Sequence, residues 1–225
     1  VEEEPLLQPD LAQTLGRIRV EGANGFYREP WAEKFVDGAN RAGGALAVSD
    51  LRGYQVVISP ALSTPAGRGH SAYFPPAPWT GGVVGAQLWA VLKGRDRFED
   101  ANAVERALLL ANASRQALAQ RERWASLPPP TADADVQGPV ADAVIKRLVT
   151  DSAEPARAAG PVPVENPSAG LIVTLDRRGQ TVACGVTLNG LFGTGRIAAG
   201  TGVLLATAPG AGGRGAAIIT PVIMV

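Results

Sequence analysis

The chain has 225 residues, of which 46% are hydrophobic, so it can bury a substantial core. Its formal net charge is zero and its charged residues are interspersed, so no basic stripe favours a nucleic acid as partner. One cysteine and one histidine exclude a disulfide framework and metal centres rich in either residue, and we expect no metal, no cofactor and no transmembrane segment.

The first 150 residues are predicted to be mainly helical. Apolar spacing with start and stop signals predicts helices at 9–20, 30–40, 49–52 (one turn), 82–92, 101–123 and 139–149. Asp10 is expected to cap the first of these helices, and Thr80 the helix at 82–92. Segments 54–58 and 70–74 are predicted to be strands, with a loop at 63–69 between them.

A β-hairpin is predicted near the end of the chain. Residues 172–175 and 181–187 have strand composition and flank a turn at 176–179, where Gly179 can adopt a positive φ. A loop with three glycines follows at 189–195. Glycines allow successive backbone amides to face one point, which is how some hydrolases build an oxyanion site.

Ordered motifs along nearly the whole chain resemble those of the γ-glutamyltransferases (glutathione hydrolases), which are N-terminal-nucleophile hydrolases. In that family the small subunit opens with a Thr-Thr-His strand, followed by an Asp-x-x-Gly turn, a Thr-x-Asn strand and a Phe-Gly-[Ser/Thr]-Gly loop. The residues that match in register are Asp176, Gly179, Thr187, Asn189, Phe192, Gly193, Thr194 and Gly195. Upstream matches lie at 11–15, 25–27, 43–54 and 76–82.

The resemblance implies an α/β (α+β) fold, the αββα four-layer sandwich of the N-terminal-nucleophile hydrolases, incomplete in this chain. Residues 1–150 would correspond to the C-terminal half of the large subunit, mainly helical. The Pro/Ala-rich stretch 151–167 would be a linker ending at the family's autocatalytic cut, and 168–225 a small-subunit-like β region with a last strand at 218–225. We expect another protein chain to supply the missing half, because a sheet without its neighbours exposes apolar faces and edges.

The family's nucleophile has no counterpart at the matching position. Such a hydrolase attacks with the hydroxyl or thiol of the residue freed by cleavage, whose own amine serves as base. Counting back from Asp176 places Ala169 at that position, and Gly170 and Leu171 at the next two, which suits a packed strand. Ser168 is the alternative nucleophile, but a shift of one residue along a strand turns a side chain to the opposite face.

Other parts of the family's site are partly kept. Thr187 and Asn189 match hydrogen-bonding residues that support the nucleophile, and both would face its old position. Gly193, Thr194 and Gly195 match the substrate loop and could keep its shape without any substrate. We interpret these five residues as a vestigial site.

The clamp for the substrate's charged end is lost. The family's acid that holds the α-amino group falls in 206–210, which has no carboxylate here, and its serine pair matches Ala217 and Ile218. Desolvating an unpaired charge is costly, so γ-glutamyl recognition has little left. We therefore expect a catalytically inactive structural or binding subunit of a larger assembly. The alternative is an active γ-glutamyltransferase that cleaves γ-glutamyl amides with Ser168, and only then is a γ-glutamyl compound expected as ligand.

The remaining conspicuous residues are expected to be structural. Cys184 has apolar neighbours and is expected to be buried and inert, and His70 is expected at the surface or a strand edge. The tryptophans, expected to anchor the core or an interface, are Trp31, Trp79, Trp89 and Trp124. No signal peptide is recognisable, and the start at Val1 is interpreted as processed, truncated or artificial. The resemblance implies a periplasmic or extracellular location.

Overall fold

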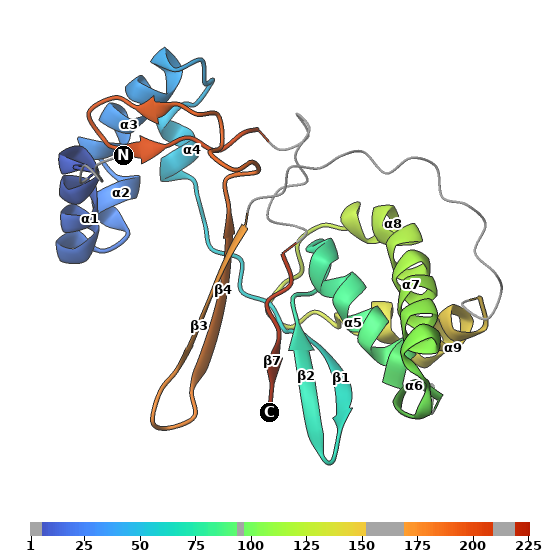
Figure 1. The fold of residues 1–225 in the computed structure, drawn as a ribbon. Coiled ribbons are helices and arrows are strands. Elements are labelled where there is room, and N and C mark those ends of the chain that lie inside the picture. The colour runs from blue at the N-terminus through green and yellow to red at the C-terminus, as the bar shows by residue number, and fades with distance from the viewer. Residues whose placement is uncertain (1–5, 94–96, 152–168, 209–218) are drawn as a thin grey trace. The chain divides into compact units, whose positions relative to one another are not determined.

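A computed structural model of the chain describes residues 6–93, 97–151, 169–208 and 219–225 (Figure 1). These residues form two units. The first contains 6–56 and 188–208, and the second contains 57–93, 97–151, 169–187 and 219–225. Each unit therefore combines segments from the early and the late part of the chain.

The first unit is a group of helices that supports a short strand pair. Its elements are α1 (Pro9–Glu21), α2 (Asn24–Tyr27), α3 (Trp31–Arg41), α4 (Val48–Arg52), β5 (Ile197–Ala198) and β6 (Val203–Leu204). Its core joins α3, α4 and β5 through Ala32, Phe35, Val36, Leu51 and Ala198. Gly38 lets α3 approach the turn after β5, because a Cβ at this position would lie 2.9 Å from the Ala199 nitrogen.

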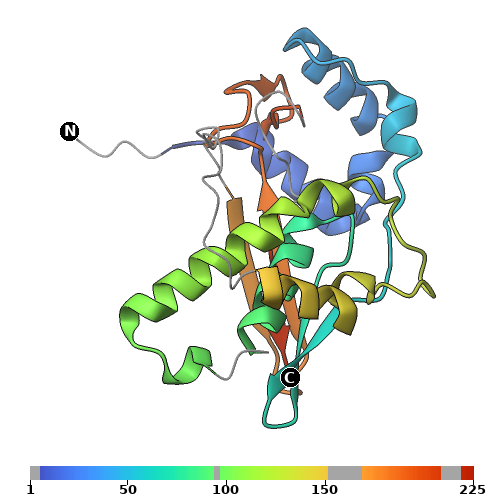
Figure 2. The ribbon, with the colours of Figure 1, turned by 90° about the vertical axis from the view of Figure 1, so that its right-hand side faces the viewer.

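The second unit contains an antiparallel sheet with helices on one side (Figures 1 and 2). Strands β1 (Leu62–Gly67), β2 (His70–Phe74) and β7 (Ile223–Met224) pair in the order β1-β2-β7. The helical elements are α5 (Thr80–Lys93), α6 (Arg97–Asp100), α7 (Ala103–Ala119), α8 (Arg121–Ala125), the 3₁₀ turn Gly138–Val140 and α9 (Asp142–Asp151). The core has two clusters, Leu62, Ala72, Phe74, Val83, Ala86 and Trp124, and Val91, Ala113 and Leu148.

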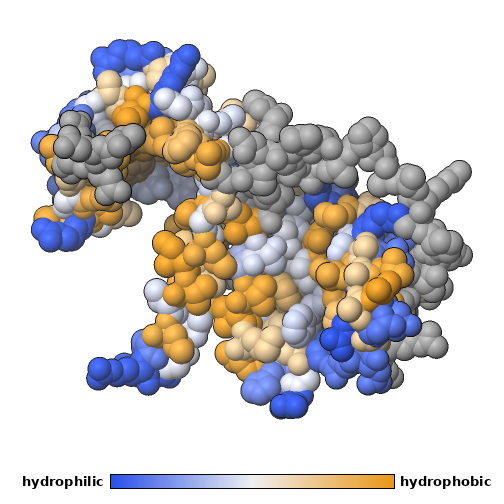
Figure 3. Space-filling view, in the orientation of Figure 1, coloured by the Kyte–Doolittle hydropathy of each residue, from blue (hydrophilic) through white to orange (hydrophobic). Residues whose placement is uncertain are grey.

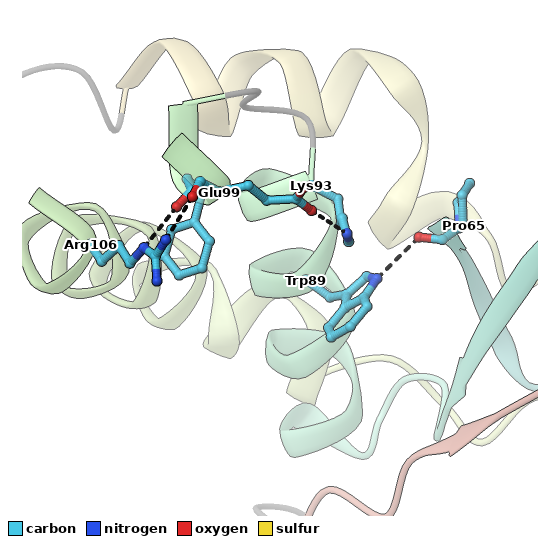
Figure 4. Close-up of polar contacts among 6 residues, drawn as sticks. Pro65, Trp89, Lys93, Glu99 and Arg106 are labelled. Carbon is cyan, nitrogen blue, oxygen red and sulfur yellow. Dashed lines mark hydrogen bonds and ion pairs between the residues drawn. The ribbon is translucent and has the colours of Figure 1, made fainter. Parts of the chain in front are cut away.

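Close packing and side-chain hydrogen bonds hold α5 in the second unit. A Cβ at Gly82 would lie 2.1 Å from the carbonyl oxygen of Pro75, so only glycine fits there. The buried Gln87 donates from Nε2 to the carbonyl of Pro139 at 3.0 Å. The Trp89 indole donates to the carbonyl of Pro65, also at 3.0 Å (Figure 4).

Exposed polar contacts join α6 to α5 and α7 (Figure 4). Lys93 Nζ donates to Glu99 Oε1 at 2.8 Å, and this hydrogen bond lowers the pKa of Glu99 from its usual value. Arg106 donates to the carbonyls of Phe98 and Glu99 at 3.1 and 2.6 Å. The charge of Arg106 also lowers the Glu99 pKa.

The predicted hairpin is confirmed and belongs to the second unit. It consists of β3 (Ala169–Leu175) and β4 (Thr181–Thr187), with Leu175 opposite Thr181 across the turn. Asp176 Oδ1 accepts hydrogen bonds from the amides of Arg178 and Gln180 at 2.8 Å each, and Gly179 has a φ of 83°. β4 contacts β7, and the hairpin lies beyond β7 from the helices (Figures 1 and 2).

Most of the other predicted elements are confirmed within a few residues. The helices at 9–20, 30–40, 49–52 and 82–92 correspond to α1, α3, α4 and α5, and the strand at 70–74 is β2. His70 is exposed, as expected. Trp31 and Trp124 are buried, and Trp79 and Trp89 are half-buried, in keeping with anchoring roles.

Two assignments around β1 were wrong. Segment 54–58 forms no strand, because its β-branched residues have no pairing partner among the described residues, and Val56 is 75% exposed. The expected loop at 63–69 instead contains most of β1. Pro65 has no amide hydrogen to donate, but β1 is an edge strand of the sheet, where proline is tolerated. The pairing with β2 shifts register just after Pro65.

Helix ends differ from the expectations in several places. The N-cap of α1 is Gln8 rather than Asp10, which lies in the first turn, and Thr80 is the first residue of α5. The helix expected at 101–123 is divided into α7 and α8, and the one at 139–149 starts with a 3₁₀ turn. At the end of the chain, only Ile223–Met224 is strand among the described residues, and Ile218 lies outside them.

Candidate functional site

Ala169 is the first residue of β3 and pairs with Thr187, the last residue of β4. Directly opposed residues in an antiparallel pair place their side chains on the same face. Thr187 therefore shares a face with the position at which the resemblance expects a nucleophile. That position carries a methyl group, which supplies neither nucleophile nor general base.

Asn189 lies just after β4, near the start of segment 188–207, which belongs to the first unit. Its φ is 59°, a left-handed conformation that asparagine tolerates better than most residues. Its side-chain Nδ2 donates to the carbonyl of Thr207 at 2.7 Å, and the Thr207 amide donates to the carbonyl of Leu188 at 3.0 Å. Asn189 thus ties the two ends of segment 188–207 together.

Three amides of the glycine-rich loop at 189–195 donate to backbone carbonyls of segment 188–207. At 2.7 to 3.2 Å, Gly193 donates to Gly190, Thr194 to Leu205, and Gly195 to Phe192. The Thr194 hydroxyl also donates to the Leu205 carbonyl at 3.1 Å. We expected the glycines to let these amides face one point, but each is directed at a different oxygen of the segment. These hydrogen bonds help to hold the loop in shape.

Gly193 and Gly195 both adopt a left-handed backbone conformation, but the space around them differs. Gly193 has a φ of 53°, and a Cβ there would lie 2.2 Å from the Leu205 carbonyl oxygen. Gly195 has a φ of 67°, with no atom within 4 Å of its potential Cβ. Gly193 is therefore required for both conformation and space, and Gly195 for conformation alone.

The middle of segment 188–207 is hydrogen-bonded to α1 and to the residue that follows α3. Thr14, which is buried on α1, donates to the carbonyl of Thr201 at 2.5 Å. A Cβ at Gly202 would lie 2.3 Å from the Leu11 nitrogen. Arg196 donates from Nη1 to the carbonyl of Ala42, just after α3, at 2.5 Å. Sequence reasoning missed Thr14 and Arg196, although Thr14 shares a helical face with the apolar Leu11.

Two further candidate residues are Ser168 and Cys184. Ser168 lies outside the described residues. Cys184 is exposed on β4, so the expectation of a buried thiol was wrong. Its flanking residues are apolar, but among the described residues nothing covers the face of the hairpin on which Cys184 lies. Among the described residues there is no group of three or more potential metal-binding side chains, and no helix is both long and apolar enough to cross a membrane.

Comparison with known sequences identifies similarity to one family. The sequence model of the gamma-glutamyltranspeptidase family matches residues 1–209. The chain is 28% identical over 210 residues to the glutathione hydrolase proenzyme of Escherichia coli, covering 89% of this chain and 36% of the relative. A glutathione hydrolase proenzyme from Pseudomonas is 30% identical, with 90% and 36% coverage. The capsule biosynthesis protein CapD proenzyme of Bacillus anthracis is 28% identical, with 88% and 35% coverage.

Solved structures confirm the expected fold. The cephalosporin acylase from Bacillus halodurans superposes with a TM-score of 0.69 at 19% identity, covering 96% of this chain and 41% of the acylase. The gamma-glutamyltranspeptidase of Helicobacter pylori superposes with a TM-score of 0.53 at 27% identity, with 70% and 45% coverage. The chain thus has the mixed α/β fold of the N-terminal-nucleophile hydrolases, and it spans about 36% of the length of its curated relatives.

Proposed function

Because the chain belongs to the gamma-glutamyltranspeptidase family, we propose that it is a γ-glutamyltransferase-like protein without turnover, acting as a structural or binding subunit of a larger assembly. Residues 1–150 would be its large-subunit-like part, 151–167 the linker, and 168–225 its small-subunit-like part. Another chain would supply the remainder of the fold. The family resemblance further favours a periplasmic or extracellular location.

The observation that carries this proposal is Ala169 at the start of β3. The β3–β4 register runs without a break from the Leu175–Thr181 pair to the Ala169–Thr187 pair. The turn that anchors the family alignment is closed by Asp176, which accepts two amide hydrogens. A slip of one residue would turn every side chain of β3 to the other face. These contacts support the alignment that places a methyl group where a hydroxyl would have to attack.

The loss of the substrate clamp supports the same proposal. Residues 206–210 contain no carboxylate that could pair with an α-ammonium group. The loop at 193–195, which would meet a substrate in the family, uses its amides for its own hydrogen bonds. A buried zwitterion without paired charges is unfavourable by several kcal/mol. In this proposal the residues that match the family's site therefore have only a structural role. They are Thr187, Asn189, Gly193, Thr194 and Gly195.

Turnover of γ-glutamyl substrates tests the proposal directly. The purified protein and its Ser168→Ala variant are assayed with glutathione and with a γ-glutamyl anilide, beside the E. coli relative as positive control. We expect both forms to remain at the background rate, because no hydroxyl occupies position 169. Turnover by the unchanged protein that disappears in Ser168→Ala would overturn the proposal.

That outcome would favour the second candidate, an active γ-glutamyltransferase with Ser168 as N-terminal nucleophile. Retention of Thr187 and Asn189 in the family's register is the observation in its favour. This candidate requires a cut before Ser168 and a γ-glutamyl compound as substrate. It also requires Ser168 to reach the face on which Ala169 lies, which a regular strand does not allow.

A further inference from the structure

One edge of the sheet in the second unit lies along β1. β1 is at one end of the order β1-β2-β7, so among the described strands only β2 pairs with it. Pro65 lies opposite Ser71 of β2, whose amide and carbonyl bond to Val225 on the β7 side at 2.7 and 3.0 Å. Opposed residues of an antiparallel pair direct their backbone groups either toward each other or both away, and the direction alternates along a strand. The backbone groups of Ser63 and Pro65 therefore point outward from β2.

An outward row of backbone groups is a template for pairing with another chain. Charged residues on the edge are a common protection, but β1 contains none. Figure 3 shows the strongly hydrophilic residues of the β1–β2 hairpin at its turn instead, where Arg68 and His70 lie. Pro65 removes one outward amide from the edge. The amide of Ser63 is thus the one that remains between the outward carbonyls of Ala61 and Pro65.

Gln137 occupies the backbone groups at the first end of this edge. Its Oε1 accepts a hydrogen bond from the Ser63 amide at 3.2 Å, and its Nε2 donates to the Ala61 carbonyl at 3.1 Å. A glutamine side chain carries a donor and an acceptor, as a peptide group does. Gln137 therefore fills the place that a residue of an added strand would take.

Trp89 occupies the carbonyl at the other end of the edge. Its indole donates to the Pro65 carbonyl at 3.0 Å, as Figure 4 shows. Trp89 lies on α5 and is half-buried against the core cluster that contains Leu62 and Phe74. The packing of its ring thus fixes the direction of its N–H group.

The segment that carries Gln137 is itself held in place. The Gln137 amide donates to Asp135 Oδ1 at 2.9 Å, and the Gln137 carbonyl accepts from the Val140 amide at 3.0 Å. Pro139 is buried, and its carbonyl accepts from the buried Gln87 of α5 at 3.0 Å. Because this backbone is already ordered, the Gln137 side chain loses little further freedom when it bonds to β1.

We propose that Gln137 and Trp89 close the outer edge of β1 against pairing with a second copy of this chain. A second copy is the expected occupant because an edge strand is complementary to itself when two molecules pair antiparallel about a two-fold axis. Without these two side chains, the Ser63 amide and the carbonyls of Ala61 and Pro65 are available, and no charge on β1 repels the copy. The closed edge lies within the second unit and does not depend on the proposed function.

Hydrogen exchange of the Ser63 amide, measured by NMR, tests the closure itself. Gln137→Asn shortens the side chain by one methylene, so it cannot reach both backbone groups. We expect the Ser63 amide to exchange about tenfold faster in this variant, as the loss of one hydrogen bond implies. Gln180→Asn, the same change at an exposed glutamine beside the hairpin turn, should leave the rate unchanged. Equal rates in the unchanged protein and Gln137→Asn would overturn the proposal.

Sedimentation velocity tests what the closure prevents. Gln137→Asn combined with Trp89→Phe should form a dimer that the unchanged protein does not form at the same concentration. Gln180→Asn combined with Trp79→Phe, which alters a half-buried tryptophan of the same unit, is the matched control and should sediment like the unchanged protein. Protection of the Ala72 amide on the buried part of β2 is followed in each variant to show that the sheet remains folded.

A third substitution shows whether the dimer forms through β1. Ser63→Pro removes the remaining outward amide at an edge position where proline is tolerated. Added to the pair Gln137→Asn and Trp89→Phe, it should abolish the dimer. A dimer that persists with Ser63→Pro would contradict the proposal, as would the absence of a dimer in the folded pair variant.

Discussion

Gly193 and Asn189 show how single residues keep the loop after β4 in shape. Asn189 combines a left-handed backbone with a hydrogen bond to Thr207, so one residue meets two requirements. Gly193 leaves room for the carbonyl of Leu205, which accepts hydrogen bonds from both the amide and the hydroxyl of Thr194. Both residues therefore contribute to the shape of the loop.

Substitution of the two loop glycines separates conformation from space. Gly195→Ala adds a Cβ in open space at a positive φ and should destabilise the protein by about 1–2 kcal/mol. Gly193→Ala adds the same strain and a contact with the Leu205 carbonyl, so its loss of stability should be larger. Thermal unfolding of the two variants beside the unchanged protein measures this difference. Equal melting temperatures for the two variants would show that the Leu205 contact is absent.

At residue level, the prediction that position 169 lacks a nucleophile depends only on spacing from Asp176, and the continuous β3–β4 register agrees with that spacing. The direction of the loop amides could not be predicted in this way. The Thr194 amide is directed by the carbonyl of Leu205, 11 residues later, and that position depends on how β5 and β6 pair. The exposure of Cys184 was also missed, since apolar neighbours in the sequence do not reveal whether a strand is covered.

Most helices and the β3–β4 hairpin followed from local patterns, and errors arose where pairing with other segments decides. α7 begins at a capping box, in which Asn102 Oδ1 accepts from the amides of Val104 and Glu105. Such a capping signal depends only on neighbouring residues, so it can be recognised in the sequence. β1 became a strand despite Pro65 because β2 pairs with it, and segment 54–58 stayed unpaired despite its composition. Tyr54 instead stacks on Tyr27, with ring centroids 5.2 Å apart.

The contact between α5 and α6 gives a pH-dependent prediction. Because Lys93 lowers the Glu99 pKa in the folded protein, this pair contributes stability above the usual glutamate range and loses it as pH falls through the lowered pKa. Lys93→Met should raise the pKa of Glu99 toward its usual value, although Arg68 and Arg106 still lower it. Lys34→Met, which removes a lysine of the first unit that is not among the groups that shift the Glu99 pKa, is the control.

Titration of the Glu99 side-chain carboxyl by NMR measures this effect. The pKa should rise in Lys93→Met and stay unchanged in Lys34→Met. An unchanged pKa in Lys93→Met would mean that the hydrogen bond seen in Figure 4 does not persist in solution. Since Glu99 is fully exposed, the accompanying change in overall stability should be small.

The chain as a whole holds two units of a larger fold. Both draw on early and late segments, so the predicted order of a helical part, a linker and a β part describes the sequence rather than these units. Periodicity could not reveal this division, because it depends on contacts between segments far apart in the chain. The exposed apolar hairpin and the 36% coverage of the relatives are explained together if the remaining fold covers the hairpin.

The central claim is that the chain lacks the residue which would cut it and then attack a substrate. The mass of the intact purified protein, with N-terminal sequencing of any fragments, tests this most directly. We predict one polypeptide that continues through residues 167–169, because position 169 offers no hydroxyl for autocatalysis. Two polypeptides, the smaller beginning at Ser168, would contradict the claim.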